Sequence, residues 1–276
     1  MTHGRAFEDQ GSSRRNARKN TRKSKIEAEL EKVVKEKFVV PEGVVPQMDT
    51  AMKFTPRGEN QKKALHAMQS GKQVNFLLGT AGSGKTLIAA CHASTLLRAK
   101  KIDKIYLVRP NVSCGKSNGS LPGDLESKLY PFFMQTIKHI EKFLGVGYTS
   151  YCLSKNIIEM CAIEYMRGSS FENCIIIADE SQNLTCDELE MLLTRIGVGS
   201  QLILTGDQKQ TDLRGNTGLV KTVDMLENAK KNRPDYLDTD DMNELLTNIS
   251  VVHFTFDDVQ RSPMTKALTK LYFYKQ

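Results

Sequence analysis

The segment FLLGTAGSGKT, from Phe76 to Thr86, constrains the fold of this chain more than any other. It contains the complete pattern G-x-x-x-x-G-K-[ST], preceded by apolar residues typical of a buried strand and followed by an apolar helical segment from Leu87 to Leu97. A strand that enters a helix through such a loop points backbone N–H groups inward and aims the positive end of the helix dipole at the same place. The pattern therefore predicts a phosphate-binding loop in an α/β fold with a mostly parallel sheet flanked by helices.

Each position of this loop has an expected role in holding ATP and Mg²⁺. Lys85 is expected to reach the β- and γ-phosphates and to act in catalysis, and the Thr86 hydroxyl is expected to ligate the magnesium ion. A glycine-rich turn without a ligand is the alternative, but every fixed position and both flanking elements agree with the phosphate loop. The predicted nucleotide-binding residues are Gly79, Thr80, Ala81, Gly82, Ser83, Gly84, Lys85 and Thr86.

A second segment, CIIIADE from Cys174 to Glu180, ends in two carboxylates. Its β-branched residues show no polar alternation, which is typical of a parallel strand buried on both faces. Ligands bind at the carboxyl ends of such strands. Asp179 is therefore predicted to hold Mg²⁺, and Glu180 to orient and polarise the water that attacks the γ-phosphate.

Two further apolar strands end in polar residues. The strand at 201–205 runs into Gly206–Gln210, where Gln210 is predicted to sense the γ-phosphate; a Gly-Asp turn with solvated side chains is the alternative. The strand at 104–108 ends at Arg109, which either faces a nucleic-acid phosphate or pairs with an acidic neighbour.

Charge is distributed unevenly along the chain. Residues 1–25 contain eight basic and two acidic residues, a net +6 of the chain's +7, so the rest is nearly neutral. This segment has few apolar residues and is predicted to be a disordered basic tail, either solubilising or a tether for a phosphate backbone. Residues 26–50 are predicted to form an amphipathic helix followed by a proline-containing linker.

The remaining composition excludes several classes of protein. The six cysteines lack the close spacing of a zinc site, and no apolar run reaches the roughly 18 residues that cross a bilayer. The N-terminus has no apolar secretory signal. We therefore expect a cytoplasmic protein with reduced thiols.

Seven motifs in this order resemble the PhoH-like family of P-loop ATPases. Two of them, L-P-G-D-L and Y-M-R-G, are more specific to that family than the phosphate loop is. The resemblance covers residues 54–275, implies a RecA-like core related to superfamily-one helicases, and defines an expected domain at 51–276 with an insertion at 111–165. The motifs lie at Gly79–Thr86, Leu107–Pro110, Leu121–Leu125, Tyr165–Gly168, Ala178–Asn183, Leu193–Gly197 and Leu204–Gln210.

The resemblance adds two expected site residues. Within Thr55–Gln61, Gln61 corresponds to the glutamine of helicases that makes a bidentate contact with adenine; a helix-surface glutamine is the alternative. Arg261 corresponds to an arginine of the family and is the candidate arginine finger, against a simple surface arginine. The family usually has a histidine where Ser262 follows it here.

The resemblance also implies hydrolysis of ATP coupled to RNA or single-stranded nucleic acid. No second motor domain follows Arg261, so we expect a homo-oligomer, with a hexameric ring as one form, in which Arg261 acts in trans. An assembly ATPase that acts on protein and, less favoured, a P-loop nucleoside kinase are the alternatives. A nuclease is not supported, because residues 1–50 are short and basic.

The insertion at 111–165 is predicted to contain a helix from Leu125 to Leu144. The insertion at 111–165 and the residue Arg167 after it carry candidates for nucleic-acid contact, although scattered basic and aromatic residues are often ordinary surface. The polar stretch from Asn228 to Asp241 is predicted to be an exposed loop. The candidate contact residues are Lys116, Lys128, Lys138, Tyr148, Tyr151 and Arg167.

Overall fold

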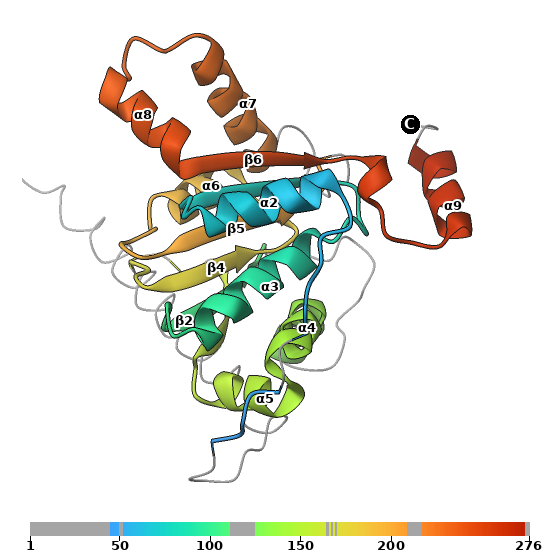
Figure 1. Ribbon diagram of the computed structural model, residues 1–276. Coiled ribbons are helices and arrows are strands. Elements are labelled where there is room, and N and C mark those ends of the chain that lie inside the picture. The colour runs from blue at the N-terminus through green and yellow to red at the C-terminus, as the bar shows by residue number, and fades with distance from the viewer. Residues whose placement is uncertain are drawn as a thin grey trace, which may run out of the picture.

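The protein is an α/β structure built on a parallel sheet (Figure 1). The computed structural model describes residues 45–49, 52–110, 125–163, 166, 168, 170–208 and 217–273. Within this part of the chain, six parallel strands form one sheet in the order β3-β2-β4-β5-β1-β6. The strands are β1 (Val74–Gly79), β2 (Lys104–Arg109), β3 (Ile158–Ala162), β4 (Cys174–Ala178), β5 (Gln201–Gly206) and β6 (Ile249–Phe254).

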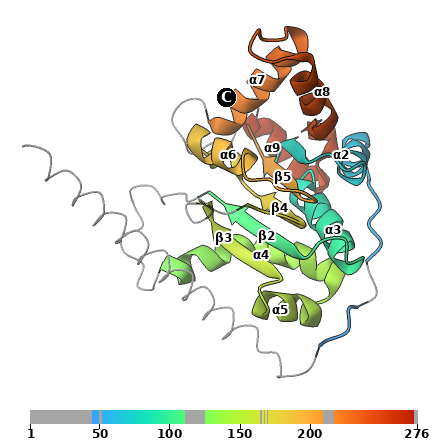
Figure 2. The same ribbon diagram turned by 90° about the vertical axis from the view of Figure 1, so that its left-hand side faces the viewer.

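Helices cover both faces of the sheet (Figure 2). One face carries α2 (Glu59–Gln69), α3 (Lys85–Arg98), α4 (Leu125–Leu144) and α5 (Val146–Ser154). The opposite face carries α6 (Cys186–Leu193) and α7 (Gly218–Lys231). The predicted fold class, an α/β fold with a mostly parallel sheet between helices, is confirmed.

The apolar run of β4 shows why its strand lacks alternation. Ile175 and Ile177 pack with α2–α5, whereas Cys174 and Ile176 pack with α6 and α7. All four are fully buried. Since both faces of a parallel strand are covered by helices, every position favours an apolar side chain.

Helix α4 is held firmly against α3 and β2. Its side chains Phe133, Ile137, Ile140 and Leu144 are buried in the core on that face of the sheet. Burial of each such side chain contributes about 1.5–3 kcal/mol. The helix expected at 125–144 thus forms with those bounds, and its apolar stripe sets its position.

The remaining elements of the C-terminal half differ from expectation in their bounds. The loop expected at 228–241 is wrong at both ends, because α7 continues to Lys231 and α8 (Thr239–Asn248) starts at a capping box made by Asp238 and Asp241. The last strand is β6, and a short 3₁₀ turn, η3 (Phe256–Asp258), follows it before α9 (Pro263–Phe273). The segment expected as an insertion includes β3, which pairs with β2 at the edge of the sheet.

Two general expectations concern thiols and membranes. Five cysteines of the described residues are free; Cys91, Cys152 and Cys174 are buried, and burial raises the pKa of Cys152 to about 12. Among the helices of the described residues, none combines the length and the apolar character required to traverse a bilayer.

Candidate active site at the carboxyl edge of the sheet

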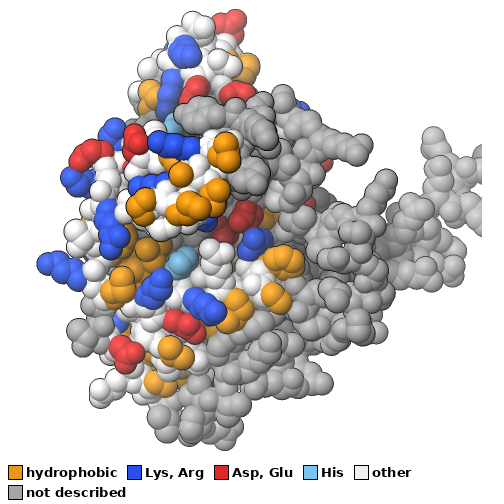
Figure 3. Space-filling model, turned by 90° about the vertical axis from the view of Figure 1, so that its right-hand side faces the viewer, with side chains coloured by type: hydrophobic (Ala, Val, Ile, Leu, Met, Phe, Trp, Pro, Cys, Tyr) orange, Lys and Arg blue, Asp and Glu red, His pale blue; other side chains and the backbone are white. Residues whose placement is uncertain are grey.

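A cavity of about 720 Å³ lies at the carboxyl edge of the sheet. All strands end at this edge because they run parallel, so residues distant in the sequence meet there. Figure 3 looks onto this side of the molecule, where hydrophobic and basic side chains surround a recess with acidic side chains. The cavity is lined by residues of the extended segment 52–57, the loop 79–86, helix α4, the ends of β4 and β5, and the segment after η3.

The predicted phosphate loop joins β1 to α3 and has the expected backbone. Gly79 and Gly84 both have positive φ values, 133° and 89°, and Gly84 is the N-cap residue of α3. A Cβ atom on Gly79 would collide with the carbonyl oxygen of Phe254 on the neighbouring strand. Glycine is therefore required here by conformation and by space.

The side chain of Lys85 curls into this loop. Its Nζ donates to the carbonyl oxygens of Gly79 at 2.5 Å and Thr80 at 2.9 Å, and lies 3.4 Å from Oγ of Ser83. Burial lowers the pKa of Lys85, and the charges of the carboxylates around it oppose this shift. The ammonium group thus stands where the loop converges, as expected for a phosphate ligand.

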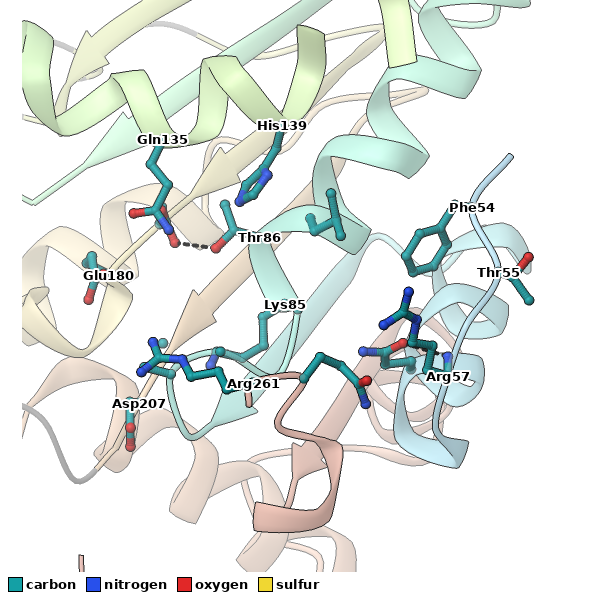
Figure 4. Close-up of a pocket in the computed structure, with 18 of the residues that line it drawn as sticks. Phe54, Thr55, Arg57, Lys85, Thr86, Gln135, His139, Glu180, Asp207 and Arg261 are labelled. Atoms are coloured by element: carbon teal, nitrogen blue, oxygen red, sulfur yellow. Dashed lines mark hydrogen bonds between the residues drawn. The ribbon is translucent and has the colours of Figure 1, made fainter. Parts of the chain in front are cut away.

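Asp179, directly after β4, accepts hydrogen bonds from three threonines. Thr86 Oγ1 donates to its Oδ1 at 3.0 Å (Figure 4), and Thr205 Oγ1 donates to the same oxygen at 2.5 Å. Thr136 Oγ1, on α4, donates to Oδ2 at 3.3 Å. The hydroxyl of Thr86 and the carboxylate of Asp179 are hard oxygen donors brought together at the helix N-terminus, and a pair of this kind fits Mg²⁺, which keeps most of its waters.

Glu180 lies beside Asp179 with a left-handed backbone, φ 56°. Its Oε2 accepts a hydrogen bond from Gln182 Nε2 at 2.6 Å, and its Oε1 lies 3.6 Å from Nη2 of Arg109. The sequence left open whether Arg109 faces a nucleic-acid phosphate or pairs with an acidic neighbour. The described contacts show the acidic neighbour, which is Glu180. Gln182 Oε1 in turn accepts from the backbone N–H of Asp207 at 3.1 Å, which joins the ends of β4 and β5.

Gln61 is buried on α2 against the phosphate loop. Its Nε2 donates to the carbonyl oxygen of Ser83 at 2.8 Å, and its Oε1 accepts from the backbone N–H of Arg57 at 2.9 Å. Both ends of the amide are therefore engaged by the chain itself. The amide keeps a second N–H donor and a second oxygen lone pair, so a bidentate contact with adenine is compatible with these two bonds.

Arg261 lies over the phosphate loop of its own chain. A Cβ atom on Gly82 would be 2.5 Å from Nε of Arg261, and the backbone N–H of Gln260 donates to the carbonyl oxygen of Gly82 at 3.0 Å. Asp258, in the turn before it, accepts from Nδ2 of Asn60 on α2 at 2.8 Å. These contacts hold the segment after β6 against the loop, and Figure 4 shows the Arg261 side chain reaching toward Lys85 and Asp207.

Several cavity residues were not singled out from the sequence. Phe54 and Arg57 stand at one end of the cavity, and Gln135 and His139 project from α4 above Thr86 (Figure 4). Burial lowers the pKa of His139; the charge of Lys142 lowers it further and that of Asp179 opposes the shift. Helical spacing places Gln135, Thr136 and His139 on one face of α4. This spacing predicts that the three side chains share a face, but it does not predict which part of the protein that face contacts.

Some predicted residues lie outside the described part of the chain. Gln210 and Arg167 are among them, as are the tail at 1–25 and most of the segment 26–50. The expected nucleic-acid contact Lys116 falls outside as well, and Lys128 belongs to the first turns of α4, where only the backbone is described. Of the remaining candidates, Tyr148 and Tyr151 are partly buried and pack against the core on the sheet face that carries α2–α5. This packing agrees with an ordinary structural role for both tyrosines.

The site combines three features: the glycine-rich loop between β1 and α3, the hydroxyl–carboxylate pair of Thr86 and Asp179, and the second carboxylate, Glu180, beside that pair. Together they define a P-loop nucleotide-binding protein. The family model described as "PhoH-like protein" matches residues 53–273. The chain therefore belongs to the PhoH-like family.

Curated relatives agree with this assignment. The PhoH-like protein of Bacillus subtilis is 34% identical over 77% of this chain and 61% of its own length. The protein PhoH of Escherichia coli K12 is 40% identical over 57% of this chain and 45% of its own length. This chain thus spans about half the length of the curated relatives it matches. Among solved structures, the SWI2/SNF2 ATPase core of Sulfolobus solfataricus in complex with dsDNA is similar at 12% identity and a TM-score of 0.41, over 76% of this chain and 47% of that chain.

Proposed function

We propose that this chain binds ATP with Mg²⁺ and hydrolyses the bond to the γ-phosphate. The observation that carries the proposal is the convergence of Lys85, the Thr86–Asp179 pair and Glu180 on one cavity. Each supplies a different requirement of phosphoryl transfer: a cation for the phosphates, oxygen ligands for the metal and a carboxylate for the attacking water.

The described residues divide the reaction among themselves. The N–H groups of the loop from Gly79 to Thr86 and the ammonium of Lys85 receive the β- and γ-phosphates. Asp179 and Thr86 would hold the metal, which supplies charge neutralisation across the phosphate oxygens when bound. Glu180 then orients the water in line with the leaving oxygen, and Gln210, which lies outside the described residues, is proposed to contact the γ-phosphate.

Arg261 is assigned to the site of its own chain. Its position over Gly82 supports a role in cis, in which the guanidinium stabilises charge that develops on the phosphate in the transition state. A mixture of Lys85→Ala and Arg261→Ala proteins separates the two arrangements. Recovery of activity on mixing requires a finger that acts in trans, whereas a mixture as inactive as its parts supports the cis assignment.

The finer proposal is that hydrolysis is coupled to RNA or to single-stranded nucleic acid. The basic segment 1–25 supports it, because eight basic residues offer a salt-dependent attraction to a phosphate backbone. The homo-oligomer, with the hexameric ring as one form, stays a prediction that the mass of the particle in solution with and without nucleotide checks. The cytoplasmic location also stays a prediction.

The experiment is an ATPase assay on the full chain with and without single-stranded RNA or DNA at two salt concentrations. Glu180→Gln and a deletion of residues 1–25 are assayed in parallel. Salt-sensitive stimulation that is lost in Glu180→Gln supports the coupled ATPase, and loss of stimulation alone on deletion assigns the tether to the tail. Hydrolysis that ignores nucleic acid contradicts the coupling and favours an ATPase that acts on protein.

The kinase alternative is separated by products. A hydrolase releases inorganic phosphate at the rate at which ADP forms, with no acceptor present. A nucleoside kinase releases ADP only when a nucleoside is added and forms the corresponding monophosphate. Formation of ADP without phosphate release in the presence of nucleosides would overturn the hydrolase assignment.

A further inference from the structure

Arg109 ends β2 and contacts both α4 and the acidic pair. Its Nη1 donates to the carbonyl oxygen of Phe132 on α4, and its guanidinium carbon lies 5.3 Å from the centre of the Phe132 ring. Its Nη2 lies 3.6 Å from Oε1 of Glu180. The Arg109 side chain is 18% exposed and the Glu180 side chain 41%, so the ion pair is shielded from solvent on the Arg109 side only.

The Glu180 carboxylate is held on both of its oxygens. Arg109 faces Oε1, and Gln182 donates to Oε2 at 2.6 Å. Gln182 is itself fixed by the backbone N–H of Asp207. A carboxylate held on both sides in this way keeps one orientation, and orientation is what activation of a water in line with the γ-phosphate demands.

Helix α4 contacts the two carboxylates of the site by two routes. Thr136 donates directly to Asp179, and Phe132, one helical turn earlier on the same face, holds the guanidinium that faces Glu180. Because the helix is a rigid unit anchored in the core, its position sets both contacts together.

We propose that Arg109 is the positioning residue for Glu180 and that it takes its own position from Phe132 of α4. This inference rests on the proposed function, since it assigns Glu180 to the attacking water. Arg109 acts through the carboxylate, without touching the nucleotide. Its loss leaves nucleotide binding intact and slows the chemical step.

Arg109→Ala and Arg109→Lys in the full chain test this inference. We expect Arg109→Ala to lower kcat about tenfold or more while KM for ATP changes less than about twofold, because a misplacement of about 1 Å is enough for such a loss. Arg109→Lys keeps the charge but loses the planar fork that reaches Phe132 and Glu180 together, so it recovers part of the rate. Added methylguanidinium should partly restore Arg109→Ala, an effect that a merely structural arginine does not produce.

Arg98→Ala is the matched control. Arg98 also anchors α4, because its Nη2 donates to the carbonyl oxygens of Phe143 at 2.6 Å and Asp49 at 2.8 Å, away from the acidic pair. Equal losses of kcat in Arg98→Ala and Arg109→Ala would show that α4 attachment alone matters and would overturn the inference. A rise of kcat in Arg109→Ala would overturn it too, since it would mean that Arg109 restrains Glu180.

A double-mutant cycle with Glu180→Gln separates this inference from the proposed function. Single-turnover phosphate release is measured for both single variants and for the double variant. If Glu180→Gln is slow and Arg109→Ala adds no further loss to it, Arg109 acts through Glu180. If Glu180→Gln is slow and the losses multiply, the inference fails while the proposed function stands. If Glu180→Gln hydrolyses as fast as the wild type, the proposed function itself fails.

Discussion

The two sides of the cavity have different origins. The phosphate side, made by Gly79–Thr86, Asp179 and Glu180, comes from loops that directly follow β1 and β4. The outer wall, made by Phe54 and by Gln135 and His139 of α4, comes from segments that only packing brings to the site. The phosphate side can be found from local patterns, whereas the outer wall depends on where α4 docks.

The difference is one of physical cause. Backbone geometry and a helix dipole build a phosphate site from consecutive residues, so few alternatives exist once the pattern is present. A helix face such as that of Gln135, Thr136 and His139 has no such constraint. Its polar residues acquire a role from their neighbours, and the apolar stripe of α4 decides which neighbours those are.

Removal of the cation from the phosphate side should have the largest effect. Lys85→Ala is expected to lower kcat/KM for ATP about 10³-fold, because the proposed function assigns the neutralisation of phosphate charge to this buried ammonium. Steady-state ATPase kinetics measure it. Lys72→Ala is the control, since Lys72 instead donates to the carbonyl oxygens of Leu246 and Thr247 at the end of α8. Similar losses in both variants would contradict the site.

A change in α4 tests whether the outer wall reaches the metal ligands. Thr136→Val removes the donor to Asp179 at nearly constant volume, and it is expected to raise the Mg²⁺ concentration for half-maximal activity about tenfold. A magnesium titration of the ATPase rate measures it. Thr149→Val, which loses a bond to the Gly145 carbonyl within α5, should leave the titration unchanged. If Thr136→Val leaves the magnesium titration unchanged, the hydrogen bond from α4 to Asp179 does not contribute to metal binding.

Phe54 lines the cavity together with Gln61, the residue expected to contact adenine, so loss of Phe54 should affect binding alone. Phe54→Ala is expected to raise KM for ATP about tenfold with little change in kcat, because an aromatic ring stacked on a base is worth about 1–3 kcal/mol. Inhibition by adenosine should weaken in this variant while inhibition by tripolyphosphate stays the same. Phe143→Leu is the control, since Phe54 packs edge-on against that ring at 6.5 Å. If tripolyphosphate inhibition weakens equally, Phe54 supports the whole site rather than the base.

The smallest expected effect is a change in the stability of the fold at His92, a buried residue of α3, the helix that follows the phosphate loop. Burial lowers the pKa of His92 below its usual value near 6.5, and the hydrogen bond with Gln201 opposes the shift. Because unfolding raises this pKa, the unfolded chain binds more protons, so stability falls as the pH drops through the unfolded value near 6.5 toward the lower folded value. Denaturant unfolding at pH 7.5 and 5.5 should show a smaller loss of stability in acid for His92→Gln than for the wild type. An equal loss in both would show that His92 is not the cause.

Most of the α/β framework was predictable because its signals are local. The helix at Leu125–Leu144 and the strand at Gln201 follow from apolar patterning. The boundary prediction near Asp238 went wrong because a side-chain cap begins the helix there, and a cap depends on rotamers that periodicity does not report. The edge strand β3 was predicted to be part of an insertion. Its five residues are too short for a clear strand pattern, and they form a strand by pairing with β2.

The site divides along the same line. From the sequence by itself follow the phosphate loop at Gly79–Thr86, the carboxylates Asp179 and Glu180 and the family, because these depend on consecutive residues with few allowed conformations. The tertiary structure alone decides that Arg109 pairs with Glu180, that Arg261 lies over its own loop and that α4 closes on Asp179. Those contacts join residues far apart in the chain, and the packing of apolar faces, rather than any local pattern, brings them within reach of one another.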